Sequence, residues 1–195
     1  VVISDGGSRD DTVRIAEAVG AVVVTGAPGR GGQLRRGVAA AGGGWLLFLH
    51  ADTQLSPGWT EAVERHIAAR ADRAGYFRLA FRGGGWRGRL VSGWANWRAG
   101  VLGLPFGDQG LLIARADLEA VGGAPDLPLM EDVALARALK GRLSALDAEA
   151  LTSPARYEAE GWLRRGARNL SLQVRYALGA DPTELARRYA SRPEN

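Results

Sequence analysis

Three acidic sites in this sequence combine residue types and positions that could support chemistry. Asp5 and Asp52 each follow a short apolar run, at 1–4 and 45–49, and Glu131-Asp132 opens a segment with helical periodicity. A carboxylate just past an apolar strand can coordinate a hard cation and leave coordination positions free for phosphate. A carboxylate can also accept hydrogen bonds from a ligand or remove a proton from a hydroxyl group. Together the three sites indicate a polar ligand-binding site.

Each site also has a purely structural interpretation, which the sequence leaves open. Asp52 or Thr53 could cap the turn into the next helix, and the stretch 5–8 could be a capped turn between a strand and a helix. The helix dipole favours acidic residues such as Glu131 and Asp132 in a first helical turn.

The elements that position these residues follow from hydrophobic periodicity. Residues 1–4 and 21–25 are predicted strands, and apolar side chains on one face of the intervening segment predict a helix that ends at Gly20. Strand, helix, strand is the unit from which parallel sheets are built. Residues 45–49 form a third, fully apolar strand, so Asp52 lies at its carboxyl end, where open α/β sheets bind ligands.

The remaining chain is predicted to alternate helices and strands. Helical periodicity favours helices at 33–41, 57–71, 86–99 and 131–139, and strands are expected at 76–81 and 111–114. Trp94 and Trp97 lie at helical spacing, which is more typical of core residues than of a ligand platform. We therefore expect both indoles in the core.

The last long helix, predicted at 162–178, is amphipathic and basic. Its arginines lie mostly off one apolar face, which is formed by Leu163, Ala167, Leu170, Val174 and Ala177. We expect this face to pack against the domain, so that the helix is a C-terminal lid. The alternative is that the helix lies on a membrane or reaches a lipid-linked acceptor.

Composition favours one globular α/β domain. The 195 residues are 46% hydrophobic and 24% charged, with a net charge of +4. No cysteine is present, so a metal would be held by oxygen or imidazole. The arginines are scattered without a nucleic-acid-binding pattern, and no apolar run reaches the roughly 18 residues of a membrane span. We expect a cytoplasmic protein, with a position at the inner membrane as an alternative.

The ordered sites resemble family 2 glycosyltransferases of the GT-A fold. The family pattern is a strand with an Asp-Gly-Ser-x-Asp-x-Thr turn, an apolar strand with an Asp-x-Asp-like element, then Gly-Gly-x-Pro and a Glu-Asp pair. Over roughly residues 1–140 this chain supplies, in order, Asp5-Gly6-Gly7-Ser8-Arg9-Asp10-Asp11-Thr12, Phe48-Leu49-His50-Ala51-Asp52-Thr53, Val121-Gly122-Gly123-Ala124-Pro125 and Met130-Glu131-Asp132.

The histidine in place of the first Asp is similar to the bacterial subgroup of radical-SAM/selenodomain-associated transferases. That subgroup also has features matching Gly29-Arg30, Gln33 and the tail 185–189. The Gln-x-x-Arg-Trp motif of processive members is not found, which implies a non-processive enzyme. The resemblance further implies a Rossmann-like, mostly parallel sheet with helices on both faces, and an N-terminal strand-helix unit that does not lie within this chain.

The resemblance implies a metal-dependent, inverting transfer of a sugar from a nucleotide diphosphate donor, most commonly a UDP-sugar, to an acceptor hydroxyl. Mg²⁺ or Mn²⁺ is the expected ion. The residues that the resemblance implies are Asp132 and Glu131 for catalysis; Asp5, Gly6, Gly7, Arg30, Ala51 and Asp52 for the nucleotide; Asp52 and His50 for the metal; and Asp108 and Gln109 for the acceptor. Asp108 and Gln109 could equally be solvated turn residues.

Within the single domain 1–195, the resemblance divides the chain into a nucleotide-sugar part (1–114), an acceptor and catalytic part (115–155) and C-terminal helices (156–195). The partners implied are the donor and an acceptor that could be lipid-linked, and nucleic acid is not expected. Two alternatives share the layout: a sugar-nucleotide nucleotidylyltransferase and a non-catalytic nucleotide-sugar-binding module. The nucleotidylyltransferase would need an activating lysine in its glycine-rich loop, and 29–36 contains none.

Overall fold

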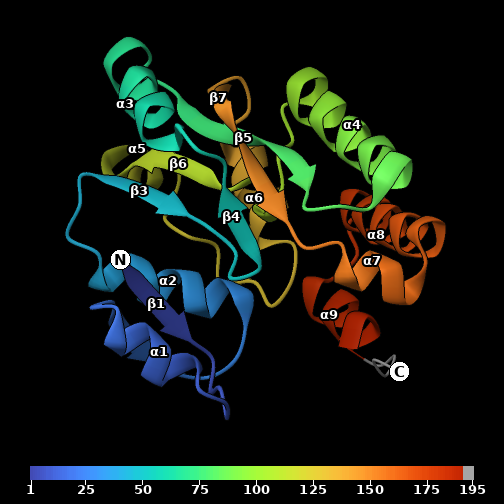
Figure 1. Ribbon diagram of the computed structural model, residues 1–195, viewed down its shortest axis with the longest axis horizontal. Helices are drawn as coiled ribbons and strands as arrows, with labels where there is room; N and C mark the ends of the chain where they lie inside the picture. Colours follow the sequence, from blue (N-terminus) through green and yellow to red (C-terminus); the bar gives the residue numbers. More distant parts are fainter. Residues whose placement is uncertain (191–195) are drawn as a thin grey trace.

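A strand, helix, strand unit opens the chain in the computed structural model, which describes residues 1–190. Strands β1 (Val2–Asp5) and β2 (Val22–Thr25) are parallel and form a two-stranded sheet, and α1 (Thr12–Ala18) connects them. Helix α2 (Arg30–Ala40) packs on both strands (Figure 1). This unit confirms the predicted parallel pairing, although α2 begins three residues before the predicted helix, so that Arg30 is its first residue.

A second sheet carries the rest of the domain. Its order is β3 (Trp45–Phe48), β6 (Leu111–Ala114), β5 (Ala74–Phe81), β7 (Leu143–Thr152) and β4 (Thr53–Leu55). The α/β class is confirmed, but this sheet is mixed rather than mostly parallel, because β5 and β7 are its one pair of neighbouring strands that is parallel and the other three pairs are antiparallel. The parallel rule applies to strands joined by a crossover helix, whereas β6 enters between β3 and β5 and runs against both.

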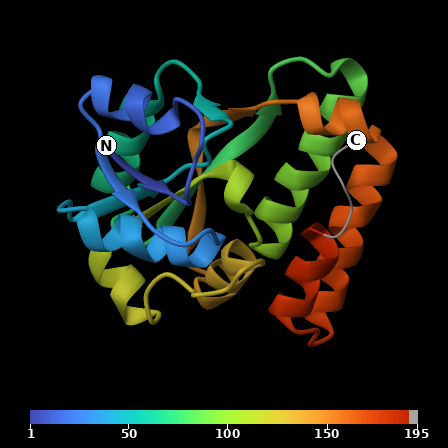
Figure 2. The same cartoon turned by 90° about the horizontal axis from the view of Figure 1, so that it is seen from below.

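The helices cover the second sheet and one end of the molecule (Figures 1 and 2). Helix α3 packs on β7, α4 on β5 and α5 on β6, while α7, α8 and α9 pack on one another. The bounds of these elements are α3 (Trp59–Ala69), α4 (Gly85–Leu102), the 3-10 helix η1 (Gly107–Gln109), α5 (Arg115–Ala120), α6 (Glu131–Ala138), α7 (Ala155–Glu160), α8 (Trp162–Ala177) and α9 (Pro182–Ala190). Residues 191–195, which were assigned to the C-terminal helices, lie outside the described residues.

Buried apolar side chains hold these layers together. Phe77 of β5 and Ile113 of β6 are fully buried between the sheet and its helices. A separate cluster attaches the C-terminal helices to the loop before α6, since Leu172 and Leu185 pack against Leu129. The predicted C-terminal helix is therefore docked on the domain.

Two expectations about apolar faces are wrong. In α8 the predicted apolar face is exposed, and the buried residues are Arg165 and Leu172. The indoles of Trp94 and Trp97 stack on each other but remain about half exposed. In α4 the side that faces the domain carries small and polar residues, which meet strand backbone. In α8 that side carries the polar residues that line the pocket, together with Leu172.

Among residues 1–190, the structure contains no helix with the length and hydropathy that crossing a bilayer requires.

Candidate functional site

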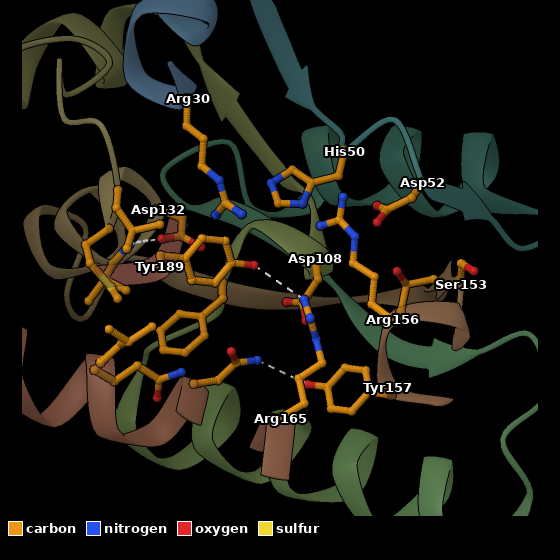
Figure 3. Close-up of a pocket in the computed structure, with 18 of the residues that line it drawn as sticks. Arg30, His50, Asp52, Asp108, Asp132, Ser153, Arg156, Tyr157, Arg165 and Tyr189 are labelled. Atoms are coloured by element: carbon orange, nitrogen blue, oxygen red, sulfur yellow. Dashed lines mark hydrogen bonds between the residues drawn. The ribbon is translucent and has the colours of Figure 1, made fainter. Parts of the chain in front are cut away.

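A polar pocket of about 160 Å³ lies at the carboxyl ends of β3, β5 and β7 (Figure 3). Its remaining wall comes from η1, the start of α6 and the C-terminal helices. The lining residues are Arg30, His50, Asp52, Phe81, Phe106, Asp108, Leu129, Met130, Asp132, Val133, Thr152, Ser153, Arg156, Tyr157, Arg165, Asn169, Leu172, Gln173 and Tyr189. The pocket thus lies where α/β sheets bind ligands, as the position of Asp52 predicted.

Asp52 presents an open carboxylate to the pocket. It follows β3 in a tight turn, closed by the hydrogen bond from Thr53 N–H to the His50 carbonyl (3.1 Å). Its side chain is exposed, and among the described residues the carboxylate accepts one long hydrogen bond, from Thr53 Oγ1 (3.4 Å). The turn is therefore closed by backbone atoms, which leaves the carboxylate oxygens of Asp52 available to a ligand.

His50 lies against the backbone of η1. A Cβ atom placed on Gly107 would come within 3.0 Å of the imidazole Nε2, so only glycine permits this close approach. His50 lines the pocket beside Asp52, and its imidazole is near enough to Asp108 to favour the charged form of that carboxyl. The structure thus brings His50 and Asp52 to one side of the pocket (Figure 3).

Asp132 lies in the first turn of α6 and is held by backbone donors. Gly107 N–H donates to Oδ2 at 2.8 Å, and Val133 N–H donates to Oδ1 at 2.8 Å. The preceding residue, Met130, has a φ of 67°, a left-handed conformation that is strained for a side chain of this size. This sharp turn directs Asp132 into the pocket while Met130 itself stays buried.

Glu131 lies behind the pocket instead of in its wall. It lines a small apolar cavity of about 50 Å³, and its side chain is only 2% exposed. Burial, followed by repulsion from Asp132, raises the pKa of Glu131 to about 7, and the guanidinium of Arg30, 3.8 Å away, acts in the opposite direction. One of its oxygens, Oε2, has no partner within the described residues. Glu131 is therefore not positioned to touch a substrate in the polar pocket.

The predicted acceptor residues separate in the structure. Asp108 lines the pocket, and burial raises its pKa, against the opposing charges of Arg98 and His50. Gln109 is fully buried outside the pocket, where its amide binds the Phe77 carbonyl and accepts from Arg98. Gln109 is thus an internal link between η1, β5 and α4, and only Asp108 faces the pocket.

The predicted nucleotide residues Asp5, Gly6, Gly7 and Ala51 do not line the pocket. Asp5 accepts from the Ser8 hydroxyl and from the N–H groups of Gly7 (2.8 Å) and Ser8 (3.0 Å). These bonds, led by that of the hydroxyl, lower the pKa of Asp5. In this structure the Asp5 carboxylate caps its own turn, in agreement with the structural interpretation of that site.

Arg30 does reach the pocket, because α2 packs closely on the loop before α6. Gly31 N–H donates to the Leu127 carbonyl at 3.0 Å, and a Cβ atom at Gly31 would lie within 3.0 Å of this loop's backbone. Gln33 ties the same helix to β1 by donating to the Ser4 carbonyl at 2.8 Å. The guanidinium of Arg30 then lies over the ring of Tyr189 of α9. Of the matching features, Arg30 and Tyr189 are thus in contact, whereas Gln33 of the same helix faces β1.

Several residues that line the pocket were not predicted from the sequence. Arg165, Asn169 and Gln173 of α8 face the pocket, and Tyr157 of α7 receives a hydrogen bond from Asn169 (3.4 Å). The three α8 residues recur every four positions, so they share one helix face. This polar stripe, centred about 120° around the helix from the apolar one, was the signal that could have identified them.

Comparison with known proteins places these features in a family. A family model described as "Glycosyl transferase family 2" matches residues 1–114, more than half of the chain. The fold is similar to that of S. aureus TarS residues 1–349 in complex with UDP-GlcNAc, at 17% identity and a TM-score of 0.59 over 78% of this chain and 49% of that one.

A second similar structure is glucosyl-3-phosphoglycerate synthase from Mycobacterium tuberculosis in complex with Mn²⁺, UDP-glucose and phosphoglyceric acid. It is 22% identical with a TM-score of 0.51, over 74% of this chain and 56% of that one. The chain therefore spans about half the length of these structures. The likeness confirms the expected GT-A fold, while the narrower resemblance to the radical-SAM-associated subgroup stays a prediction. Because the family model covers most of the chain, the protein belongs to glycosyl transferase family 2.

Proposed function

We propose that the protein is a glycosyltransferase that moves a sugar from a nucleotide diphosphate donor, with a UDP-sugar as the first candidate, to an acceptor hydroxyl. The observation that carries this proposal is the meeting of Asp52 and Asp132 in one polar pocket, although they come from distant parts of the chain. The similar structures, which hold UDP-GlcNAc and UDP-glucose, support the choice of donor. The division into a nucleotide-sugar part (1–114) and an acceptor and catalytic part (115–155) stays part of the proposal, with Asp108 and Arg156 as residues that cross it.

On the donor side, Asp52 is the proposed ligand of a Mg²⁺ or Mn²⁺ ion, with His50 as a second candidate. The described residues hold no cluster of three or more metal-ligating side chains. One open carboxylate fits a cation shared with a substrate diphosphate, because Mg²⁺ is commonly held by one or two carboxylates plus substrate phosphates. When bound, such a cation neutralises charge on the departing diphosphate.

Arg156 and Arg30 are the proposed cationic partners of the diphosphate. Arg156 is exposed at the start of α7 and reaches toward the side of the pocket that holds His50 and Asp52 (Figure 3). A guanidinium can pair with phosphate oxygens through two parallel hydrogen bonds. Asp5, Gly6, Gly7 and Ala51 are retained as candidates for the base and ribose, which would extend beyond the pocket toward β1.

On the acceptor side, Asp132 is the proposed general base of a single displacement. It accepts the proton of the acceptor hydroxyl while the acceptor oxygen bonds to the anomeric carbon and the bond from that carbon to the diphosphate oxygen breaks, with inversion. The two backbone hydrogen bonds hold its carboxylate in place for this transfer. Asp108, which lines the same pocket, is the proposed hydrogen-bonding partner of the acceptor. Glu131 acts indirectly, by positioning Arg30. A single transfer per encounter, without processivity, is part of the proposal.

The donor assignment is tested with Asp52→Ala. Calorimetric titration of UDP into the protein with Mn²⁺ should show metal-dependent binding that this variant loses. Asp72→Ala, at an exposed carboxylate far from the pocket, is the matched control. Unchanged UDP affinity in Asp52→Ala would sink the assignment of the metal site.

The catalytic assignment is tested with Asp132→Asn, which should retain UDP binding and lose turnover of the UDP-sugar. Hydrolysis or transfer at the wild-type rate would remove Asp132 from the mechanism. If the wild-type protein binds UDP-sugars with metal but never turns them over, the non-catalytic binding module is the correct function.

A further inference from the structure

We propose that the face built from α4 and α8 binds the surface of an anionic phospholipid bilayer. The two helices lie side by side in both views (Figures 1 and 2), and Trp162 at the start of α8 packs over Gly84 and Gly88 at the start of α4. This inference rests on the surface of these helices and is independent of the sugar-transfer chemistry.

Helix α4 presents its large apolar side chains to solvent. The side chains of Trp86, Leu90, Trp94, Trp97 and Val101 are between 49% and 64% exposed. At ~100° per residue these five positions fall within an arc of about 80°, so they form one continuous stripe. A monomeric soluble surface seldom gathers this much aromatic and aliphatic area along one line.

The opposite side of α4 explains why the stripe points outward. The residues buried against β5 include the small Gly88, Ala95 and Ala99. Asn96 fixes the helix to the strand, since its amide donates to the Leu79 carbonyl at 3.0 Å and accepts from the Leu79 N–H at 2.8 Å. The domain therefore holds α4 by its small and polar face, which leaves the apolar face without a partner among the described residues.

Helix α8 repeats this inversion. Its inner face carries Arg165, which pairs with Glu160 and is buried against the pocket. The apolar residues occupy the outer face, and Leu163 is 90% exposed, with Leu170 and Val174 also exposed. The alternative interpretation of this helix, contact with a membrane, therefore agrees with the direction in which its apolar face points.

The charge around the α4 stripe and the outer face of α8 is positive, which matches an anionic surface. Segments 73–107 and 161–180 contain ten arginines and no acidic residue. Arg98 and Arg165 are buried, and the other eight arginines are at least partly exposed. Arg87 and Arg89 flank the α4 stripe on its two sides, and the Arg87 guanidinium lies over the ring of Trp86 at 5.2 Å. Arginine beside an exposed apolar stripe can reach lipid phosphates while its stem and the indoles enter the interface.

The same charge distribution argues against a second copy of the chain as the occupant. A symmetric dimer through this face would bring each arginine-rich surface against an identical one, which costs repulsion. An anionic bilayer instead gains attraction from every exposed arginine near it.

The test is flotation of the protein with vesicles of phosphatidylcholine alone or mixed with phosphatidylglycerol. We expect binding to the mixed vesicles that is about tenfold stronger than to the neutral ones and that weakens as salt is raised. Trp94→Gln/Trp97→Gln and Leu163→Gln/Val174→Gln should each reduce it by about tenfold or more. Ile15→Gln, at an exposed apolar residue of α1, is the matched control and should bind like the wild type.

All of these substitutions are at exposed side chains, and far-UV circular dichroism verifies that each variant keeps its fold. Wild-type protein that ignores anionic vesicles, or double variants that bind as well as the wild type, would overturn the proposal. A stable dimer in sedimentation that the same substitutions dissociate would overturn it in favour of a second copy. Blue-shifted tryptophan emission on mixed vesicles, quenched by brominated lipid and lost in Trp94→Gln/Trp97→Gln, would support it.

Discussion

Replacing Glu131 by Gln removes a carboxyl group that the fold keeps away from water. Its pKa is about 7 in the folded protein against an ordinary value of 4.5, because burial and Asp132 both disfavour its charge. The folded state therefore binds this proton more tightly than the unfolded chain does. As the pH rises through this window, ionisation favours the unfolded chain, so Glu131 makes the protein less stable at high pH.

The magnitude follows from the displacement of the pKa. A difference of about 2.5 pKa units corresponds to ~3 kcal/mol of lost stability once the pH is above about 8, and to ~1 kcal/mol at about pH 5. Gln resembles the protonated acid and does not ionise, so Glu131→Gln should avoid this loss. We expect the difference in the free energy of unfolding, variant minus wild type, to increase by about 2 to 3 kcal/mol as the pH rises from about 5 to about 8.

The assay is urea denaturation of both proteins at several pH values between these limits. The comparison uses the change with pH, because an amide at the position of Oε2, which has no hydrogen-bond partner among residues 1–190, can add a constant offset of about 1–3 kcal/mol. Glu17→Gln, on the exposed surface of α1, is the control and should follow the wild type at every pH. If the difference between Glu131→Gln and the wild type is the same at both ends of the range, the reasoning from burial is refuted.

Three further substitutions probe the contacts around the pocket. Gly31→Ala places a methyl group within 3.0 Å of the backbone of the 125–127 loop and should lower the free energy of unfolding by about 1–3 kcal/mol, measured by urea denaturation. Gly107→Ala places a methyl group within 3.0 Å of the His50 imidazole, which can rotate away. This substitution should therefore reduce turnover about tenfold and have a smaller effect on stability. Arg156→Ala should weaken calorimetric UDP binding about tenfold, the loss of one charged hydrogen-bonding partner.

Matched controls separate these effects from general disturbance. A Cβ atom at Gly42 would meet no atom within 4 Å, so Gly42→Ala should change neither stability nor turnover. Arg70→Ala, at the exposed end of α3, should leave UDP binding unchanged. A Gly31→Ala protein as stable as Gly42→Ala, or Arg156→Ala and Arg70→Ala proteins with equal UDP affinity, would contradict the corresponding contact.

Several features of the site were accessible from local sequence. The apolar run before His50 and Asp52 indicated a strand, and the carboxyl end of such a strand is where the pocket lies. The Glu131-Asp132 pair at a helix start was correctly placed as well. The sequence did not separate the two residues, because neighbours in the first turn of a helix point in different directions and burial decides which one reaches a pocket.

Gln109 and Asp5 illustrate what local pattern cannot decide. Both were predicted to contact ligands, yet Gln109 is bonded internally and Asp5 to its own turn. Polar side chains are alike in sequence whether they serve a ligand or a distant backbone carbonyl. The choice depends on which atoms the fold brings within hydrogen-bonding distance.

Periodicity determined which residues of α4 and α8 share a face, and the family motifs determined the order of the carboxylates along the chain. Tertiary structure alone decided which way those faces point. In α8 the stripe that includes Arg165 turns inward, because Glu160 pairs with that guanidinium and the pocket offers polar surroundings, and Leu163 is therefore left in solvent. A hydrophobic pattern fixes the angles between side chains on one helix, whereas the direction of burial depends on partners that only the folded chain supplies.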